Sequence, residues 1–147
     1  MNKWTVIFGI LAILSIAFIF YNSMQSPTES EERSLAIVEQ VKPFWDAEGR
    51  MTQKAFNDMI RTMAHLAEFA MLGFSLGGML ISLQGRGRER LIRNVLLMSA
   101  GVAIADEVLQ HFTGRYSDVK DVMLDVCGAL IGVVIMKIAM KVMWHRK

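Results

Sequence analysis

The 147-residue sequence has one cysteine, Cys127, which excludes a disulfide framework or a CxxC pair within one chain. It has no defensible internal repeat, no motif for a catalytic nucleophile, no metal-binding signature and no phosphate-cradling loop. The formal net charge is only +2, and no nucleic-acid-binding motif accompanies it. These absences remove most soluble enzyme classes and give no reason to expect a nucleic-acid partner.

Apolar residues are abundant: 53% of the chain is hydrophobic, and its mean hydropathy is +0.35. Four apolar segments, at about 4–21, 64–83, 91–109 and 122–140, are long enough to cross a bilayer as helices. The first is too long for a signal peptide and lacks a small-residue cleavage site, so we expect it to be retained. The sequence therefore predicts an all-α fold, an integral membrane four-helix bundle formed by a single domain over residues 1–147.

The distribution of basic residues predicts the orientation of the bundle, because short cytoplasmic loops are enriched in Lys and Arg. The linker between the second and third segments and both ends of the chain are basic, so we expect the N- and C-termini to be cytoplasmic. Residues 22–60 and 110–121 are then external, and the chain is a multi-pass protein of the cell membrane. The basic residues that determine this prediction are Lys3, Arg86, Arg88, Arg90, Arg93, Lys141, Arg146 and Lys147.

The external segment 22–60 has its own helical signals. Thr28 and Glu31 have the spacing of a capping box, and Pro43 is expected to end the helix that follows. A second helix is expected to begin near Thr52 and to continue without a break into the second apolar segment. An apolar stripe on the first of these helices is expected to lie on the outer leaflet; it consists of Leu35, Val38 and Val41.

Ionisable residues gather at the outer ends of three apolar segments. In the stretch "RTMAHLAEF", Arg61, His65 and Glu68 follow at i, i+4 and i+7 and share one helical face. Because an ionisable residue at the bilayer centre costs roughly 2.5–3.5 kcal/mol on insertion scales, a functional role is the default interpretation. We expect one polar pocket, open to the outside and lined by the second, third and fourth segments. Its other expected members are Asp106, Glu107, Gln110, Arg115, Asp121 and Asp125.

Small residues indicate which helical faces pack together. Gly73 with Gly77, and Gly128 with Gly132, form two GxxxG patterns of the kind that allow close packing of membrane helices. In the third segment, one small and polar stripe is expected to face the bundle interior; it consists of Ser99, Ala103, Asp106 and Gln110.

Structural interpretations of the same residues remain open. Charges near helix ends often lie among lipid headgroups, and Arg61 and Arg115 can simply neutralise neighbouring carboxylates. His65 and Glu68 have the spacing of a reversed ExxH metal pair, but no second histidine lies nearby. We therefore expect no metal ion and no cofactor.

The stretches "RTMAHLAEF" and "DEVLQHFTGRYSDVKDVMLDVCGALIG" together resemble the VanZ-like family of small membrane proteins. The resemblance covers nearly the whole chain and departs from the family at Asp125, where the family commonly has Asn. It implies a role in the bacterial cell envelope, related to resistance to the glycopeptide teicoplanin, and implies no established reaction. The residues that carry it are Arg61, His65, Glu68, Asp106, Glu107, Gln110, Phe112, Gly114, Arg115, Asp121, Gly128 and Gly132.

Three functions follow from these patterns. In the first and preferred one, Arg61 and Arg115 hold the phosphate or carboxylate of a membrane lipid, a cell-wall precursor or a lipoglycopeptide. In the second, the protein is an enzyme acting on an envelope lipid or sugar, with His65 as base and Glu68 or Asp106 as acid. In the third, a proton-coupled carrier uses the same groups as a relay. The sequence favours a protein that is not an enzyme and leaves its association into homo-oligomers open.

Overall fold

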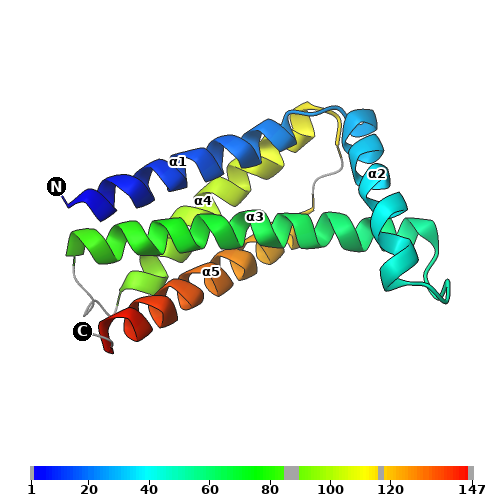
Figure 1. Cartoon of the computed structure of the whole chain (residues 1–147). Coiled ribbons are helices and arrows are strands. Elements are labelled where there is room, and N and C mark those ends of the chain that lie inside the picture. Colours follow the sequence, from blue (N-terminus) through cyan, green and yellow to red (C-terminus); the bar gives the residue numbers. More distant parts are fainter. Residues whose placement is uncertain (1, 85–89, 116–117, 146–147) are drawn as a thin grey trace.

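A computed structural model describes residues 2–84, 90–115 and 118–145 of the chain. Within these residues the protein is entirely helical, as the sequence predicts, and has no β-strand (Figure 1). Of the basic residues that predict the topology, Arg86, Arg88, Arg146 and Lys147 lie outside the described residues. The five helices are α1 (Lys3–Ser23), α2 (Pro27–Trp45), α3 (Gln53–Gln84), α4 (Leu91–Phe112) and α5 (Val119–His145).

Helices α1, α3, α4 and α5 run alongside one another, and α2 lies across one end of this bundle (Figure 1). Helix α3 is central because it contacts each of the other four helices. Both termini lie at the end of the bundle opposite α2 (Figure 1). Lys3 at the start of α1 and Lys141 near the end of α5 are thus separated by the length of the bundle from the predicted polar site.

Three of the helices, α1, α3 and α5, are long and apolar enough to cross a membrane. Helix α4, which the sequence also predicts to span, is not among them, because it carries Arg93, Asp106 and Glu107 within its 22 residues. The prediction of four spanning helices is therefore matched only in part. Large apolar side chains such as Ile13 and Leu97 are exposed on the outside of the bundle, as expected for surfaces that face lipid.

Glycine residues bring α3 and α5 into contact backbone to backbone. A Cβ atom on Gly132 would overlap the carbonyl oxygen of Ala70, and one on Gly73 would overlap that of Ala129. A Cβ on Gly128 would lie 2.6 Å from the carbonyl oxygen of Leu66. The close packing predicted from the GxxxG patterns is confirmed. The bundle core that surrounds this contact includes Phe69, Leu72, Leu76, Val95, Val133 and Met136.

The small and polar stripe of α4 faces the interior, also as predicted. Ser99, Ala103, Asp106 and Gln110 are all buried. Since these residues recur every three or four positions, they form one face of the helix. Asp106 is consequently held inside the bundle and does not face lipid.

Helix α2 begins and ends differently from the sequence prediction. Its N-cap is Ser26, whose hydroxyl accepts a bond from the backbone N–H of Glu29, while the Glu29 carboxylate accepts from that of Ser26. This pair has the same capping-box spacing as Thr28 and Glu31, and Pro27 then occupies the favourable first helical position. Pro43 does not end the helix, because its missing N–H removes only one bond in the last turn.

The apolar stripe of α2 packs against α3 and does not lie on the outer leaflet. Val38 is almost completely buried, and Leu35 and Val41 are half-buried. The apolar side chains that α2 exposes most are Phe44 and Trp45, at 85% and 81%. The expected position of the stripe on the outer leaflet is therefore wrong, because α3 covers this face of α2.

Helix α3 runs unbroken from Gln53 into the apolar segment, as predicted, and Thr52 caps it by accepting a bond from the backbone N–H of Ala55. Its 32 residues span about 48 Å, which exceeds the roughly 30 Å of a hydrocarbon core. The N-terminal turns of α3 therefore extend beyond the predicted membrane segment and support α2.

The glycine contact gives a direct prediction. Gly132→Ala should lower the free energy of unfolding in mixed detergent micelles by roughly 1–3 kcal/mol, because the new methyl group forces α5 away from α3. Gly101→Ala is the matched control: a Cβ at this position would have no atom within 4 Å, so stability should be unchanged or slightly raised. Equal stability of the Gly132→Ala variant and the wild type would contradict the backbone-to-backbone contact.

Candidate functional site

The polar site is formed where α1, α3, α4 and α5 meet near α2. Helix α3 carries Arg61, His65 and Glu68 along one face. The Glu68 carboxylate accepts a hydrogen bond of 2.8 Å from the side-chain amide of Asn22, at the end of α1. Polar side chains that are far apart in sequence therefore meet at one end of the bundle.

A first cavity, of about 290 Å³, lies between α1, α2 and α3 beside the turn that follows α4. Its ionisable lining contains three arginines and only one glutamate, together with a histidine. The positive groups thus outnumber the negative ones, which favours an anion. The polar residues most relevant here are Asn22, Arg33, Arg61, His65, Glu68 and Arg115.

A second cavity, of about 220 Å³, lies between α3, α5 and the end of α4. Its charges are more balanced, because two aspartates accompany two arginines. Arg61, His65 and Arg115 line both cavities and separate them. The polar lining includes Asp58, Arg61, His65, Gln110, Arg115 and Asp121.

The single pocket predicted from the sequence is not found in that form. The predicted residues are divided between the two cavities, and α1 and α2 line the first cavity although the prediction assigned neither of them to it. Asp106, Glu107 and Asp125 line neither cavity. The space is divided by the side chains of Arg61, His65 and Arg115, which line both cavities.

Arg115 is positioned by the C-terminal cap of α4. Gly114 adopts a positive φ of 76°, and the backbone N–H groups of Gly114 and Arg115 donate to the carbonyls of His111 and Gln110. These two bonds define a Schellman motif, which reverses the chain directly after the helix. Arg115 is thereby directed toward the end of α1, where its guanidinium donates to the carbonyl oxygen of Asn22 at 3.3 Å.

The guanidinium of Arg115 keeps unused donor capacity. Its Nε is buried without a hydrogen-bond partner. Burial, and then the nearby charge of Arg61, lower the pKa of Arg115, while Asp106, Glu107 and Glu68 act in the opposite direction. In the described part of the chain neither Arg61 nor Arg115 has an ion pair within 4.0 Å. Direct neutralisation by a carboxylate, the structural alternative raised from the sequence, is therefore not seen as a contact.

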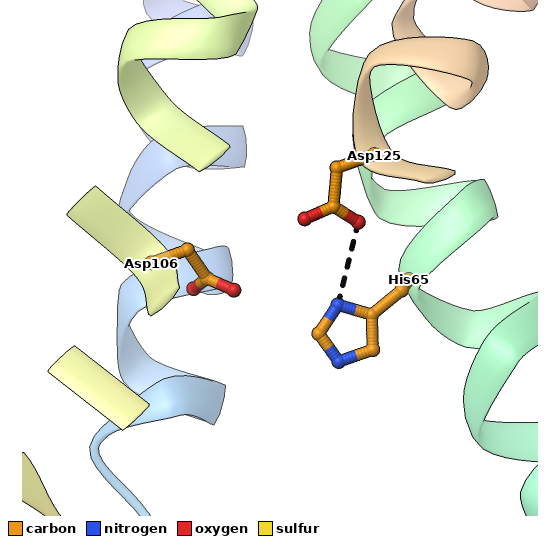
Figure 2. Close-up of side chains that lie close together, drawn as sticks. All are labelled: His65, Asp106 and Asp125. Carbon is orange, nitrogen blue, oxygen red and sulfur yellow. Dashed lines mark ion pairs between the residues drawn. The ribbon is translucent and has the colours of Figure 1, made fainter. Parts of the chain in front are cut away.

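A buried cluster lies beneath the cavities. His65 of α3, Asp106 of α4 and Asp125 of α5 direct their side chains into a common space (Figure 2). One ligand atom from each lies within 4.8 Å of the others, and Nδ1 of His65 is 3.5 Å from Oδ1 of Asp125. Asp106 is held by Ser23, whose hydroxyl donates to it, and by the side-chain amide of Gln110, which donates at 2.8 Å.

Glu107 and Asp121 lie outside this cluster. One carboxylate oxygen of Glu107 accepts a 3.0 Å hydrogen bond from the backbone N–H of Asp118, so Glu107 ties the start of α5 to α4. Its other oxygen is buried without a partner. Asp121 is half-buried and lines the second cavity.

Among the residues of the site that the sequence analysis missed are Asn22, Ser23 as a partner of Asp106, and Arg33 of α2. Each belongs to a segment that becomes part of the site only through tertiary packing. The one sequence signal for Arg33 is its helical spacing from Ser30, Ser34 and Ile37, which places these residues on one face of α2. All of them line the first cavity.

The arrangement supports two kinds of chemistry. Guanidinium groups with unused donors suit phosphate or carboxylate oxygens, which they bind in a bidentate manner. An imidazole between buried carboxylates suits either proton transfer or a cation.

Comparison with known proteins agrees with this picture of a small helical membrane protein. No curated protein and no solved structure gives a significant match to the chain. The sequence model of the family described as VanZ/LLP1 matches residues 8–140, which is nearly the whole chain and includes every residue of the site. The apolar helices, the polar residues gathered at one end of the bundle and this match lead to one conclusion: the chain belongs to the VanZ/LLP1 family.

Proposed function

We propose that this protein is a non-enzymatic factor of the bacterial cell envelope whose first cavity binds the anionic group of an envelope lipid, a cell-wall precursor or a lipoglycopeptide. Family membership supports the envelope setting. A role in resistance or tolerance to teicoplanin is the physiological form of this proposal, because a protein that binds such molecules alters what the antibiotic reaches.

The observation that carries the proposal is the pair of arginines without carboxylate partners. Arg61 and Arg115 lie at one cavity although their charges repel, and Nε of Arg115 is buried without a hydrogen-bond partner. Keeping two like charges together in a partly desolvated cavity is unfavourable unless an anion joins them. A phosphate or carboxylate supplies both the charge and the acceptor oxygens that these donors lack.

The proposed orientation has both termini in the cytoplasm and the two cavities on the external side of the cell membrane. It is supported by Lys3, Arg93 and Lys141, which lie in the helical turns at the end of the bundle away from α2. Helix α4 crosses as a fourth span in this arrangement. Although it is less apolar than the others, its buried carboxylates and Gln110 face protein and not lipid.

Removal of Arg115 should weaken anion binding directly. We expect Arg115→Ala to bind phosphatidylglycerol roughly 10- to 100-fold more weakly than the wild type, since a lost hydrogen bond to a charged group costs about 1.5–3 kcal/mol. Native mass spectrometry of delipidated, purified protein measures this, with zwitterionic phosphatidylcholine as the comparison lipid. Arg50→Ala is the matched control, because Arg50 is exposed and paired with Glu48. Equal lipid retention by the Arg115 variant and the wild type would remove the proposal.

The orientation is tested by cysteine labelling of intact cells. In a Cys127→Ser background, Glu48→Cys between α2 and α3 should react with a membrane-impermeant maleimide. Lys141→Cys near the end of α5 should react only after the cells are opened. The reverse pattern would place the cavities in the cytoplasm.

A second candidate, a membrane enzyme, is favoured by one observation: Nδ1 of His65 faces the buried carboxylate of Asp125 at 3.5 Å. Such a carboxylate orients an imidazole for general-base catalysis. Under this hypothesis the purified protein converts a radiolabelled envelope lipid, and His65→Gln lowers the rate by roughly 100-fold or more. Absence of turnover by the wild-type protein, under conditions where it binds the lipid, would leave the binding function alone.

A further inference from the structure

We propose that His65, Asp106 and Asp125 bind a divalent metal ion, with Zn²⁺ as the ion whose preferences fit best. This proposal concerns the buried cluster and does not depend on anion binding by the arginines. It also revises the sequence-based expectation that the chain holds no metal.

The first argument is the environment of Asp125. Its side chain is 0% exposed, and both of its carboxylate oxygens lack a hydrogen-bond partner in the described part of the chain. Nδ1 of His65 is buried and likewise without such a partner. An ionised carboxylate buried in this way is strongly unfavourable unless a cation accompanies it, and the imidazole of His65, 3.5 Å away, is a cation only when it is protonated. A metal ion gives all of these atoms a partner at once.

The second argument is geometric. In a tetrahedral zinc site with ligand distances of about 2.0–2.2 Å, adjacent ligand atoms lie roughly 3.4 Å apart. Nδ1 of His65 and Oδ1 of Asp125 are already 3.5 Å apart, and one ligand atom from each of the three residues lies within 4.8 Å of the others. Small side-chain rotations would therefore bring the three ligand atoms to the distances of a tetrahedral site. Figure 2 shows the three side chains directed from separate helices into one space.

The third argument is the outer shell of the cluster. Ser23 and Gln110 donate hydrogen bonds to different oxygens of Asp106 and fix its orientation toward the other two residues. Groups of this kind orient the ligands in metal sites. Three protein ligands leave one tetrahedral position for water or for a bound molecule. Because His65 also lines both cavities, it connects the cluster with them.

Zn²⁺ is the better choice among divalent ions because imidazole nitrogen and carboxylate oxygen are both among its common ligands. Ca²⁺ and Mg²⁺ prefer six or more oxygen ligands, which the two carboxylates and one imidazole of this cluster do not provide. The absence of cysteine from the cluster disfavours the thiolate-dependent sites of copper(I) and iron–sulfur centres.

The test is the metal content of the full-length protein, purified in detergent through a tag that contains no histidine, incubated with ZnCl₂ and desalted. We expect inductively coupled plasma mass spectrometry to find about one zinc ion per chain in the wild type. The zinc content of the Asp106→Asn and Asp125→Asn variants should be roughly a tenth of this or less. Glu107→Gln is the matched control. Glu107 is a buried neighbour of Asp106, and the amide keeps an acceptor for Asp118, so this variant should retain the wild-type zinc content.

A measurement on the wild type alone removes the dependence on how well the variants fold. Addition of Co²⁺ should produce visible absorption bands of a tetrahedral ion, and equimolar Zn²⁺ should abolish them. If neither zinc retention nor these bands are found, His65 and Asp125 form an ion pair or share a proton, and the metal proposal is wrong. Arg115→Ala should keep its zinc while it loses lipid, so the two proposals fail separately.

Discussion

The site depends above all on the contact between α3 and α5. Gly73, Gly128 and Gly132 allow the two backbones to approach to a distance that no side chain would permit. Within a bilayer, apolar burial gives little net attraction between helices, so dispersion contacts over such a surface are a main source of association. The same approach places His65 of α3 opposite Asp125 of α5. Packing energy and site geometry therefore have the same origin.

Helices α1 and α4 supply the other hydrogen-bonding and charged residues of the site. The end of α1 contributes Asn22, whose carbonyl oxygen accepts a hydrogen bond from Arg115 and whose side-chain amide donates one to Glu68. It also contributes Ser23, whose hydroxyl donates a hydrogen bond to Asp106. Helix α4 contributes Asp106 from a buried polar stripe, and its Schellman cap directs Arg115 to the same place. The positive groups line the cavities, whereas Asp106 and Asp125 are buried below them. One end of the bundle therefore carries both proposed sites, the anion site at the first cavity and the cation site at the buried cluster.

The sequence predicts much of the architecture because membrane helices obey simple rules of length, charge and small-residue spacing. The bounds of the apolar segments, the continuity of α3 and the inward face of α4 all follow from such local patterns. The position of the α2 cap was wrong by two residues because Ser26–Glu29 and Thr28–Glu31 have the same spacing. The division of the pocket and the contributions of Asn22 and Arg33 were not predictable, since they arise from contacts between distant segments. The sequence places His65, Asp106 and Asp125 in one polar pocket but does not set them apart as a cluster, because they come from three helices and have no characteristic spacing.

The position of helix α2 bears on how a molecule of the proposed kind would enter the first cavity. It forms one wall of the first cavity, yet it packs mainly against α3 and takes no part in the contact between α3 and α5. The stability of the bundle and the width of the cavity mouth are thus governed by different surfaces. Under the proposed function, mutations along Leu35, Val38 and Val41 would change the rate at which a bulky amphiphile enters while leaving the transmembrane core intact. The range of molecules that the cavity accepts can then diverge through α2 alone, without any change in the helices that are apolar enough to cross the bilayer.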